Sequence, residues 1–178
     1  MTRKVEVVAY HSAWPERFKA EARELAGIFD KRLLSIHHFG STAIPGISAK
    51  PIIDILVIVD DIQAVDRLNE RLREIGYHAV GEYGIPGRRF FYKGTPDLRT
   101  HHLHVYQSGS PHILRHLAFR DYMLAHPSSA RAYSLLKERL AVQYPEDMES
   151  YIAGKDTFVK EQEKRALEWY SELDKKRL

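Results

Sequence analysis

The stretch at residues 38–59, HFGSTAIPGISAKPIIDILVIV, joins a loop of small residues to the strongest strand pattern in the chain. Residues 40–50 are rich in glycine, proline and small polar side chains, which predicts a loop with tight turns. Residues 52–59 are apolar at every position except Asp54, and such a run predicts a central strand that is covered on both faces. The fold should therefore be α/β, with a sheet built around this strand.

Helix and strand patterns alternate on either side of this stretch. Apolar residues spaced by three and four predict a helix that has Pro15 in its first turn and runs to about residue 33. Residues 36–39 predict a short strand, and the apolar spacing over residues 65–75 predicts a helix that Gly76 ends. Three further strand patterns, separated by turns that contain glycine and proline, lie at residues 77–81, 88–93 and 101–106.

The last third of the chain has only helical patterns. Ser110 as an N-cap, followed by Pro111, predicts a first helix. Ser128 or Ser129 is expected to cap a second helix, and residues 147–173 predict a third. The 178 residues, 44% of them hydrophobic, are enough for one sizeable core. We therefore expect one compact unit, with an α/β core over residues 1–107 and a helical portion over residues 108–178 packed on it.

Charge and cysteine content exclude several classes of protein. Lys and Arg total 27 against 24 Asp and Glu, a formal net charge of +3, so bulk charge does not favour nucleic-acid binding. The chain has no cysteine, which excludes disulfides, thiolate metal sites and cysteine nucleophiles. No signal peptide is evident, and no segment approaches the roughly 20 apolar residues that cross a bilayer. We expect a cytoplasmic protein with no membrane contact, whose oligomeric state the sequence leaves open.

Asp54 is the one charge in the central strand pattern, and alternation places it on the same face as Leu56 and Ile58. An unpaired carboxylate in such surroundings is costly, so it must meet a cation, a metal ion or several donors. It could be a core aspartate that pairs with Lys50 or caps a turn. The residues around it favour a functional role.

The loop before Asp54 supplies Gly40, Ser41 and Thr42 directly after a strand pattern. Small residues there let backbone N–H groups and hydroxyls approach an anion closely, although an ordinary tight turn has the same composition. Lys50, at the end of the loop, could bind a phosphate or simply neutralise Asp54. The two roles of Lys50 stay open.

The segment RTHHLHVY carries His102 and His104 on one face of a predicted strand, together with Tyr106. The opposite face carries Leu103 and Val105, which should pack against helices. Two histidines spaced by two on a strand can converge on one metal ion or one phosphate. In the neighbouring pattern GIPGRRFFYKG, alternation points either Arg88 or Arg89 to the same face as a phosphate clamp and leaves the other solvated.

The stretch HFGSTAIPGISAKPIIDILVIV, the pattern HHLHVY, the segment FRDYMLAHP and the late pair Tyr151 and Lys155 together resemble the GrpB family over almost the whole chain. The resemblance implies the fold of the nucleotidyltransferase superfamily, a mixed sheet flanked by helices with a C-terminal helical portion. In that superfamily a Gly-Ser or Gly-Gly turn precedes a strand with two carboxylates, a later strand adds a third, and together they hold two divalent metal ions. Some relatives are fused to dephospho-coenzyme A kinase, which implies a nucleotide-related context.

Carried over to this chain, the resemblance implies an incomplete carboxylate set. Gly40 and Ser41 match the turn and Asp54 matches the first carboxylate, whereas Leu56 occupies the second position. His104, ahead of His102, stands where the third acidic group is expected. One carboxylate with histidines would bind a single divalent ion of softer preference than Mg²⁺, or no metal.

Two further matches have structural interpretations that we favour. Arg120 and Asp121 lie on a predicted helix, where a salt bridge on the surface or between helices is expected. Tyr151 and Lys155 are spaced by four on the last helix and could close over the cleft, but a structural tyrosine with an extended lysine is the preferred interpretation.

The leading hypothesis is a nucleotidyl- or phosphoryl-transferase-like protein that binds a nucleotide or another phosphate-bearing small molecule. Asp54 and His104 would be the catalytic residues, Arg88 and Arg89 candidate phosphate ligands, and Asp54 with His102 or His104 the ligands of one divalent ion. The cleft would be lined by Gly40, Ser41, Thr42, Lys50, Asp54, His102 and His104. The alternative is a catalytically inactive nucleotide-binding or folding-assistance module, which Leu56 favours. Nucleic-acid binding is disfavoured.

Overall fold

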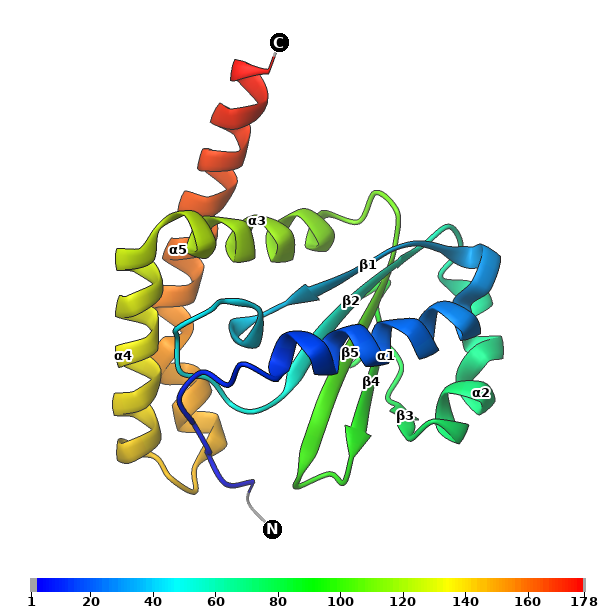
Figure 1. Cartoon of the computed structure of the whole chain (residues 1–178), viewed down its shortest axis with the longest axis horizontal. Helices are drawn as coiled ribbons and strands as arrows, with labels where there is room; N and C mark the ends of the chain where they lie inside the picture. Colours follow the sequence, from blue (N-terminus) through cyan, green and yellow to red (C-terminus); the bar gives the residue numbers. More distant parts are fainter. Residues whose placement is uncertain (1–2, 178) are drawn as a thin grey trace.

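A computed structural model describes residues 3–177 and contains a mixed sheet of five strands in the order β1-β2-β5-β4-β3 (Figure 1). Only β2 and β5 run parallel to each other, and the other neighbouring pairs are antiparallel. The strands are β1 (Leu33–Phe39), β2 (Ile53–Val59), β3 (Tyr77–Ala79), β4 (Arg89–Gly94) and β5 (Arg99–Gln107). The expected mixed α/β architecture is confirmed.

Five α-helices and three short 3₁₀ turns complete this part of the chain. The helices are α1 (Trp14–Phe29), α2 (Asn69–Glu74), α3 (Pro111–Ala125), α4 (Pro127–Gln143) and α5 (Met148–Lys176). The 3₁₀ turns are η1 (Asp30–Arg32), η2 (Ser41–Ala43) and η3 (Gln63–Leu68). None of the helices between residues 3 and 177 combines the length and the apolar character that crossing a bilayer requires. The cytoplasmic location stays a prediction.

Helix α1 covers one face of the sheet (Figure 1). Its buried stripe includes Trp14, Leu25 and Phe29, and it packs in one cluster with Leu103 and Val105 of β5, as alternation along that strand predicts. The helix ends at Phe29 rather than near residue 33. Asp30 has a φ of 50°, which breaks the helical path, so the prediction was too long at this end.

Strand β2 lies between β1 and β5, which confirms the expected central position. In the parallel register of β2 and β5, Asp54 is the partner of His102 and Leu56 is the partner of His104. Partners in a ladder share a face, so the register places the one carboxylate of β2 beside two imidazoles.

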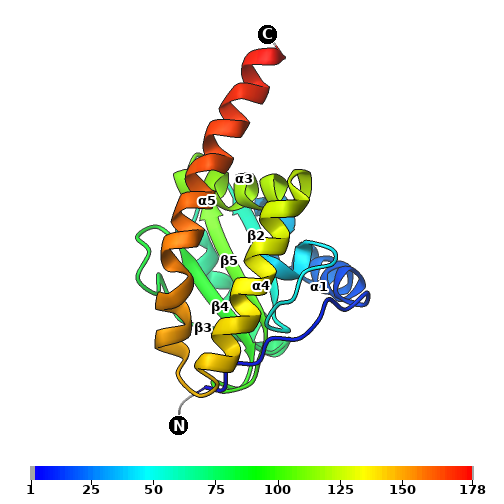
Figure 2. The same ribbon diagram turned by 90° about the vertical axis from the view of Figure 1, so that its left-hand side faces the viewer.

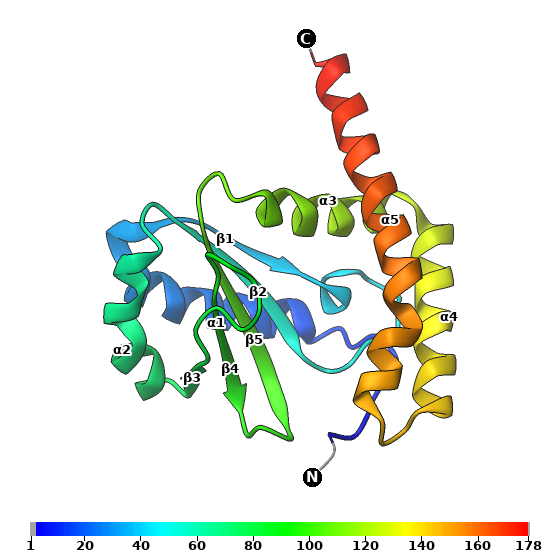
Figure 3. The same cartoon turned by 180° about the vertical axis from the view of Figure 1, so that it is seen from behind.

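The helices α3, α4 and α5 form the other side of the molecule, and Figure 2 shows α4 and α5 running alongside each other there. A second hydrophobic cluster joins Ile44 and Ile47 of the loop before β2 to these helices. The far end of α5 extends beyond the rest of the chain (Figure 3). The division into a core of residues 1–107 and a helical portion of residues 108–178 stays a prediction.

The starts of α3 and α4 test the two predicted caps. Ser110 and Pro111 lie in the expected positions at the start of α3, although the Ser110 side chain makes no capping hydrogen bond. Helix α4 begins at Pro127 with His126 in the cap position, so the cap expected at Ser128 or Ser129 is wrong. Proline fits the first helical turn because its missing N–H would have no partner there, and this moves the start ahead of the serines.

Candidate functional site

Asp54 and two histidines meet at the face of the sheet opposite α1. The Oδ1 atom of Asp54 lies 3.5 Å from Nδ1 of His102 and 3.8 Å from Nε2 of His104. The three side chains can offer ligand atoms that all lie within 4.8 Å of one another, close enough for one metal ion. The sequence placed these residues on one face, and the parallel register brings them together.

Arg88 fixes the proton position of His104. The guanidinium donates to the backbone carbonyl oxygens of Glu82 and Tyr83, and its Nη1 lies 3.4 Å from Nδ1 of His104. Arginine has no acceptor atom, so Nδ1 of His104 must accept. The neutral ring then carries its proton on Nε2, the atom that faces Asp54. His104 thus directs the N–H of its Nε2 toward the Asp54 carboxylate.

Arg89 lies away from these residues. Its Nε donates to Oδ1 of Asp66 over 2.7 Å and its Nη2 donates to Oδ2 over 3.2 Å. Of the two candidate arginines, Arg88 therefore shares the face of the histidines, and Arg89 does not reach the candidate site. Strand alternation predicts that the two differ, and the ladder decides which of them faces His104.

Asp54 and His104 are in the protonation states that binding a metal cation requires. Burial lowers the pKa of His104 below its ordinary value, which keeps the imidazole neutral near pH 7. Burial alone would raise the pKa of Asp54, but hydrogen bonds and charge interactions with His102 and His104 outweigh it and lower this pKa. An ionised carboxylate and neutral imidazoles are the forms that bind metal ions.

The turn after β1 brings its backbone against Asp54. Gly40 has φ 71° and ψ −172°, a conformation that is essentially restricted to glycine. A Cβ atom at this position would lie 3.0 Å from Cγ of Asp54 and would collide with Oδ2. The sequence predicts a tight turn here, and the structure adds that Gly40 is needed for the approach to the carboxylate.

The two hydroxyls of this turn differ in their contacts. Oγ1 of Thr42 donates to the carbonyl oxygen of Ile52 over 3.3 Å and lies 2.9 Å from Nε2 of His38. Burial lowers the pKa of His38 to about 4, so the neutral ring donates from Nε2 to the Thr42 hydroxyl. Thr42 therefore holds the loop in place, and both Ser41 and Thr42 line the pocket described next.

A pocket of about 160 Å³ opens in front of Asp54 and His102. Three lysines also line it, Lys50 from the loop, Lys137 from α4 and Lys155 from α5. The complete lining comprises Gly40, Ser41, Thr42, Lys50, Ile52, Asp54, His102, Tyr133, Lys137, Tyr151 and Lys155. Every residue of the expected cleft except His104 lines this pocket. Arg88 and Arg89 are absent from the lining.

Tyr133 and Lys137 are site residues that the sequence analysis missed. They repeat the spacing of four that separates Tyr151 from Lys155, and in both pairs the lysine Nζ lies over the tyrosine ring, at 4.3 Å and 4.9 Å from its centroid. The repeated Tyr-x-x-x-Lys pattern in two neighbouring helices is the signal that could have found them. Tyr151 and Lys155, for which a structural role was preferred, line the pocket as well.

Several polar atoms around the pocket are buried without a partner. Among residues 3–177, Nζ of Lys137, the hydroxyl of Tyr151 and Nε2 of His102 make no hydrogen bond. Burial and the charge of Lys155 lower the pKa of Lys137 to about 7 and that of Lys50 to about 8. Buried polar groups are normally paired, so these atoms favour a polar ligand in the pocket.

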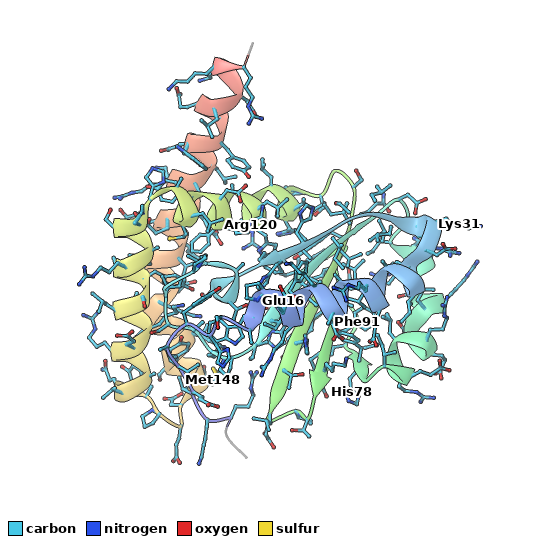
Figure 4. The ribbon with its side chains drawn as sticks, in the orientation of Figure 1. Glu16, Lys31, His78, Phe91, Arg120 and Met148 are labelled. Atoms are coloured by element: carbon cyan, nitrogen blue, oxygen red, sulfur yellow. The ribbon has the colours of Figure 1, made fainter. Side chains whose placement is uncertain are left out.

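Arg120 and Asp121 have structural contacts, as expected. The Nε of Arg120 lies 2.7 Å from Oδ1 of Asp121, and its Nη1 donates to the carbonyl oxygen of His38 over 3.1 Å. Tyr170 of α5 donates to Asp121. Figure 4 labels Arg120 on α3, from which it ties the end of β1 to the helices.

A larger groove of about 520 Å³ lies between the loop before β2 and helices α3 and α4. It is bordered mainly by apolar side chains, including Ile44, Ile47 and Met123. Its lining, within the described part of the chain, contains no cluster of metal-binding or cationic groups. The smaller pocket at Asp54 is therefore the candidate site.

Comparison with known proteins places the chain in a family. The sequence profile of the family described as "GrpB protein" matches residues 4–165. The chain belongs to the GrpB family. It is 47% identical to the UPF0157 protein YqkA of Bacillus subtilis over 94% of this chain and 48% of that protein. It is 41% identical to the glutamate-rich protein GrpB of Alkalihalophilus pseudofirmus over 89% of this chain and 93% of that protein.

The GrpB fold is also known from a crystal structure. The conserved protein GrpB from Enterococcus faecalis superimposes with a TM-score of 0.89 at 46% identity and covers 93% of this chain and 99% of that one. More distant similarity extends to a dephospho-CoA kinase of Mycolicibacterium paratuberculosis, 27% identical over 93% of this chain and 46% of that protein. The chain thus spans about half the length of some of its relatives, including YqkA at 48%.

Proposed function

We propose that the pocket at Asp54 binds a phosphate-bearing small molecule, with nucleotides as the leading class, together with one divalent metal ion. The observation that carries the proposal is that a carboxylate, an imidazole and three lysines line one small pocket. Asp54 and His102 can hold a metal ion, and no carboxylate pairs with the three lysines within the described chain. A phosphate bound to both a metal ion and the ammonium groups satisfies both sets of side chains.

The donor set fits one metal ion held by Asp54 and His102. Nε2 of His102 is buried without a partner among residues 3–177, and the ring lines the pocket. His104 would act through Asp54, because its Nδ1 accepts from Arg88 and its Nε2 keeps its proton. The bound ion would supply Lewis-acid polarisation of a phosphate oxygen. Zn²⁺ or Mn²⁺ suits a mixed carboxylate and imidazole site better than Mg²⁺.

Two metal ions are not expected here. Two divalent ions a few Å apart are normally tolerated only where several carboxylates neutralise them. Leu56 occupies the second carboxylate position of the superfamily and is fully buried. Asp60 and Asp61 follow the far end of β2, roughly 20 Å from Asp54 at about 3.3 Å per residue.

The remaining residues would bind and orient the phosphate. The three ammonium groups offset its negative charge, and the Ser41 hydroxyl at the mouth of the turn can donate to it. On this basis the favoured activity is nucleotidyl or phosphoryl transfer, with Asp54 in contact with the metal and His104 as a positioning residue. The buried Leu56 supports the second candidate, a nucleotide-binding module without catalysis.

A binding screen tests the proposal and separates the two candidates. Calorimetric titration of ATP, GTP and coenzyme A, each with Mn²⁺, Zn²⁺ or Mg²⁺, is expected to detect a complex that weakens in the double variant Ser41→Ala and Lys50→Ala. Release of phosphate or pyrophosphate from the bound nucleotide would support transfer. Binding without turnover would support the inactive module, and unchanged affinity in the double variant would exclude this loop as the phosphate site.

Anion affinity should fall as pH rises from 6.5 to 9. The pKa of Lys137 is lowered to about 7 and that of Lys50 to about 8, so both ammonium groups lose their protons within this range. Sulfate remains a dianion throughout, and the loss of two nearby charges should weaken its binding roughly tenfold or more. Calorimetry with EDTA present measures this effect. Lys137→Arg keeps its charge and should flatten the profile, whereas a wild-type affinity that stays constant or rises would contradict the prediction.

A further inference from the structure

A second hollow lies directly beside the phosphate pocket. Lys50 and Ile52 line both hollows, so the two adjoin each other. The second one, about 40 Å³, is bordered by the N-terminal segment, the start of β5 and the start of α5, where Figure 4 labels Met148. Arg3 and Arg99 line it from two of these segments. It thus presents two guanidinium groups next to a lysine of the first pocket.

A shift in strand register directs the Arg99 side chain to the second hollow. Simple alternation from His102 would point residue 99 to the opposite face of the sheet. The ladder between β4 and β5 shifts between Lys93 and Gly94, so that Gly94 pairs with Arg99. The Arg99 guanidinium consequently stacks on Tyr92, the ladder partner of His102, with Cζ 4.3 Å from the ring centroid. Its Nε is buried and has no hydrogen-bond partner among the described residues.

Arg3 lies at the same hollow because a backbone hydrogen bond holds the segment that follows it. The N–H of Val5 donates to the carbonyl oxygen of Pro145 over 2.9 Å. Burial and the nearby charge of Arg99 lower the pKa of Arg3, and both arginines add to the positive field at Lys50. The carboxylates that border the hollow, on Glu6 and Asp97, are exposed and form no ion pair within residues 3–177.

Six lysine and arginine side chains therefore line the two adjoining hollows. Lys137 and Lys155 lie in the first pocket, Lys50 lines both, and Arg3, Arg99 and the exposed Lys4 line the second hollow. Like charges repel, and holding them together is unfavourable unless a counter-charge lies among them. One phosphate in the first pocket would leave the two arginines with only the exposed carboxylates of Glu6 and Asp97 near them. Guanidinium groups are suited to phosphate because they can donate two parallel hydrogen bonds.

We propose that Arg3 and Arg99 form a second anion subsite, and that the preferred ligand is a polyphosphate, with one phosphate at the lysines and the next at the arginines. This inference rests on the proposed function of the first pocket. The two hollows, about 160 Å³ and 40 Å³, are small, so any base or sugar attached to the phosphates would lie outside them.

The test compares inorganic phosphate, pyrophosphate and tripolyphosphate by calorimetry on the full chain, with EDTA present so that chelation of metal does not contribute. Wild type is expected to bind tripolyphosphate at least about tenfold more tightly than phosphate. The double variant Arg3→Gln and Arg99→Gln should lose most of this gain and keep its affinity for phosphate within about twofold. Arg23→Gln with Arg67→Gln, two exposed arginines outside both hollows, removes the same charge and should behave as wild type.

The possible outcomes distinguish failure of the second anion subsite from failure of the proposed function. If wild type binds none of the three anions, the proposed function fails. If it binds phosphate but gains nothing from further phosphates, or if the double variant keeps the full gain, only the second subsite is excluded. Should the Arg99 variant not fold, Arg3→Gln alone decides, because Arg3 lies in the N-terminal segment outside the helices and strands and should by itself reduce the gain at least threefold, about 0.7 kcal/mol.

Discussion

Replacing Gly40 by alanine is expected to lower the free energy of unfolding by about 2–6 kcal/mol and to abolish metal binding. The conformation of Gly40 would cost any other residue about 1–3 kcal/mol. The new methyl group would also collide with Oδ2 of Asp54, and such overpacking costs about 1–3 kcal/mol more. Either the strand or the carboxylate must move, so Asp54 would leave its position beside His102. Urea unfolding followed by circular dichroism measures the first effect, and calorimetry measures the second.

Gly46→Ala is the matched control for this variant. Gly46 lies in the same loop with a φ of 84°, but a Cβ atom there would meet nothing within 4 Å. Its substitution should cost about 1 kcal/mol from the backbone alone and leave metal binding intact. Equal effects of the two substitutions would show that the contact between Gly40 and Asp54 has no special importance.

Asp54→Asn should reduce Zn²⁺ or Mn²⁺ affinity at least about a hundredfold, because the amide removes the one negative charge of the donor set. His102→Gln removes a direct ligand and should reduce the metal affinity about tenfold or more. His104→Gln should reduce the metal affinity less, because His104 acts only through Asp54. Wild type should bind one equivalent, and the affinity should rise when phosphate is present. Metal titration by calorimetry gives both the stoichiometry and the affinities.

Asp66→Asn provides the comparison, because Asp66 is half-exposed and pairs with Arg89 away from the pocket. It should bind metal as wild type does. Two equivalents of Mg²⁺ bound in the presence of a triphosphate would contradict the single-ion site. A larger loss in His104→Gln than in His102→Gln would overturn the assignment of His102 as the direct ligand. No metal binding of any kind would favour the inactive module.

The sequence predicted the elements well wherever the apolar spacing was regular. The central strand was expected one residue longer than the observed Ile53–Val59, because the pattern includes Ile52 but not the limit of the ladder. Most errors lie at the ends of elements, and in the helix predicted over residues 65–75 the first part is the 3₁₀ turn η3. Asp30 ends α1 early through its positive φ, and Pro127 starts α4 ahead of the expected serine cap. Both are single-residue backbone effects that periodicity does not contain.

In the candidate site too, some side-chain positions follow from the local sequence and others only from long-range packing. Alternation along β2 and β5 is enough to place Asp54, His102 and His104 on one face, because a strand fixes the direction of each side chain locally. The same rule fails for Arg99, since its direction depends on a register shift against β4. The Tyr-x-x-x-Lys spacing marks Lys137 only as a repeat of the later pair, because its place in the pocket depends on how α4 packs against the loop before β2.

The sequence by itself thus determined the α/β class, the central strand and the face that carries the carboxylate and imidazoles, since each follows from periods of two or of three to four residues along one segment. Only the tertiary structure decided that three lysines from distant segments line one pocket with that carboxylate, and that Arg3, Lys4 and Arg99 line the adjoining hollow. The net charge of +3 for the whole chain does not indicate this cluster of basic side chains. The sum over the sequence ignores position, whereas the electrostatic energy depends on the distances that packing sets.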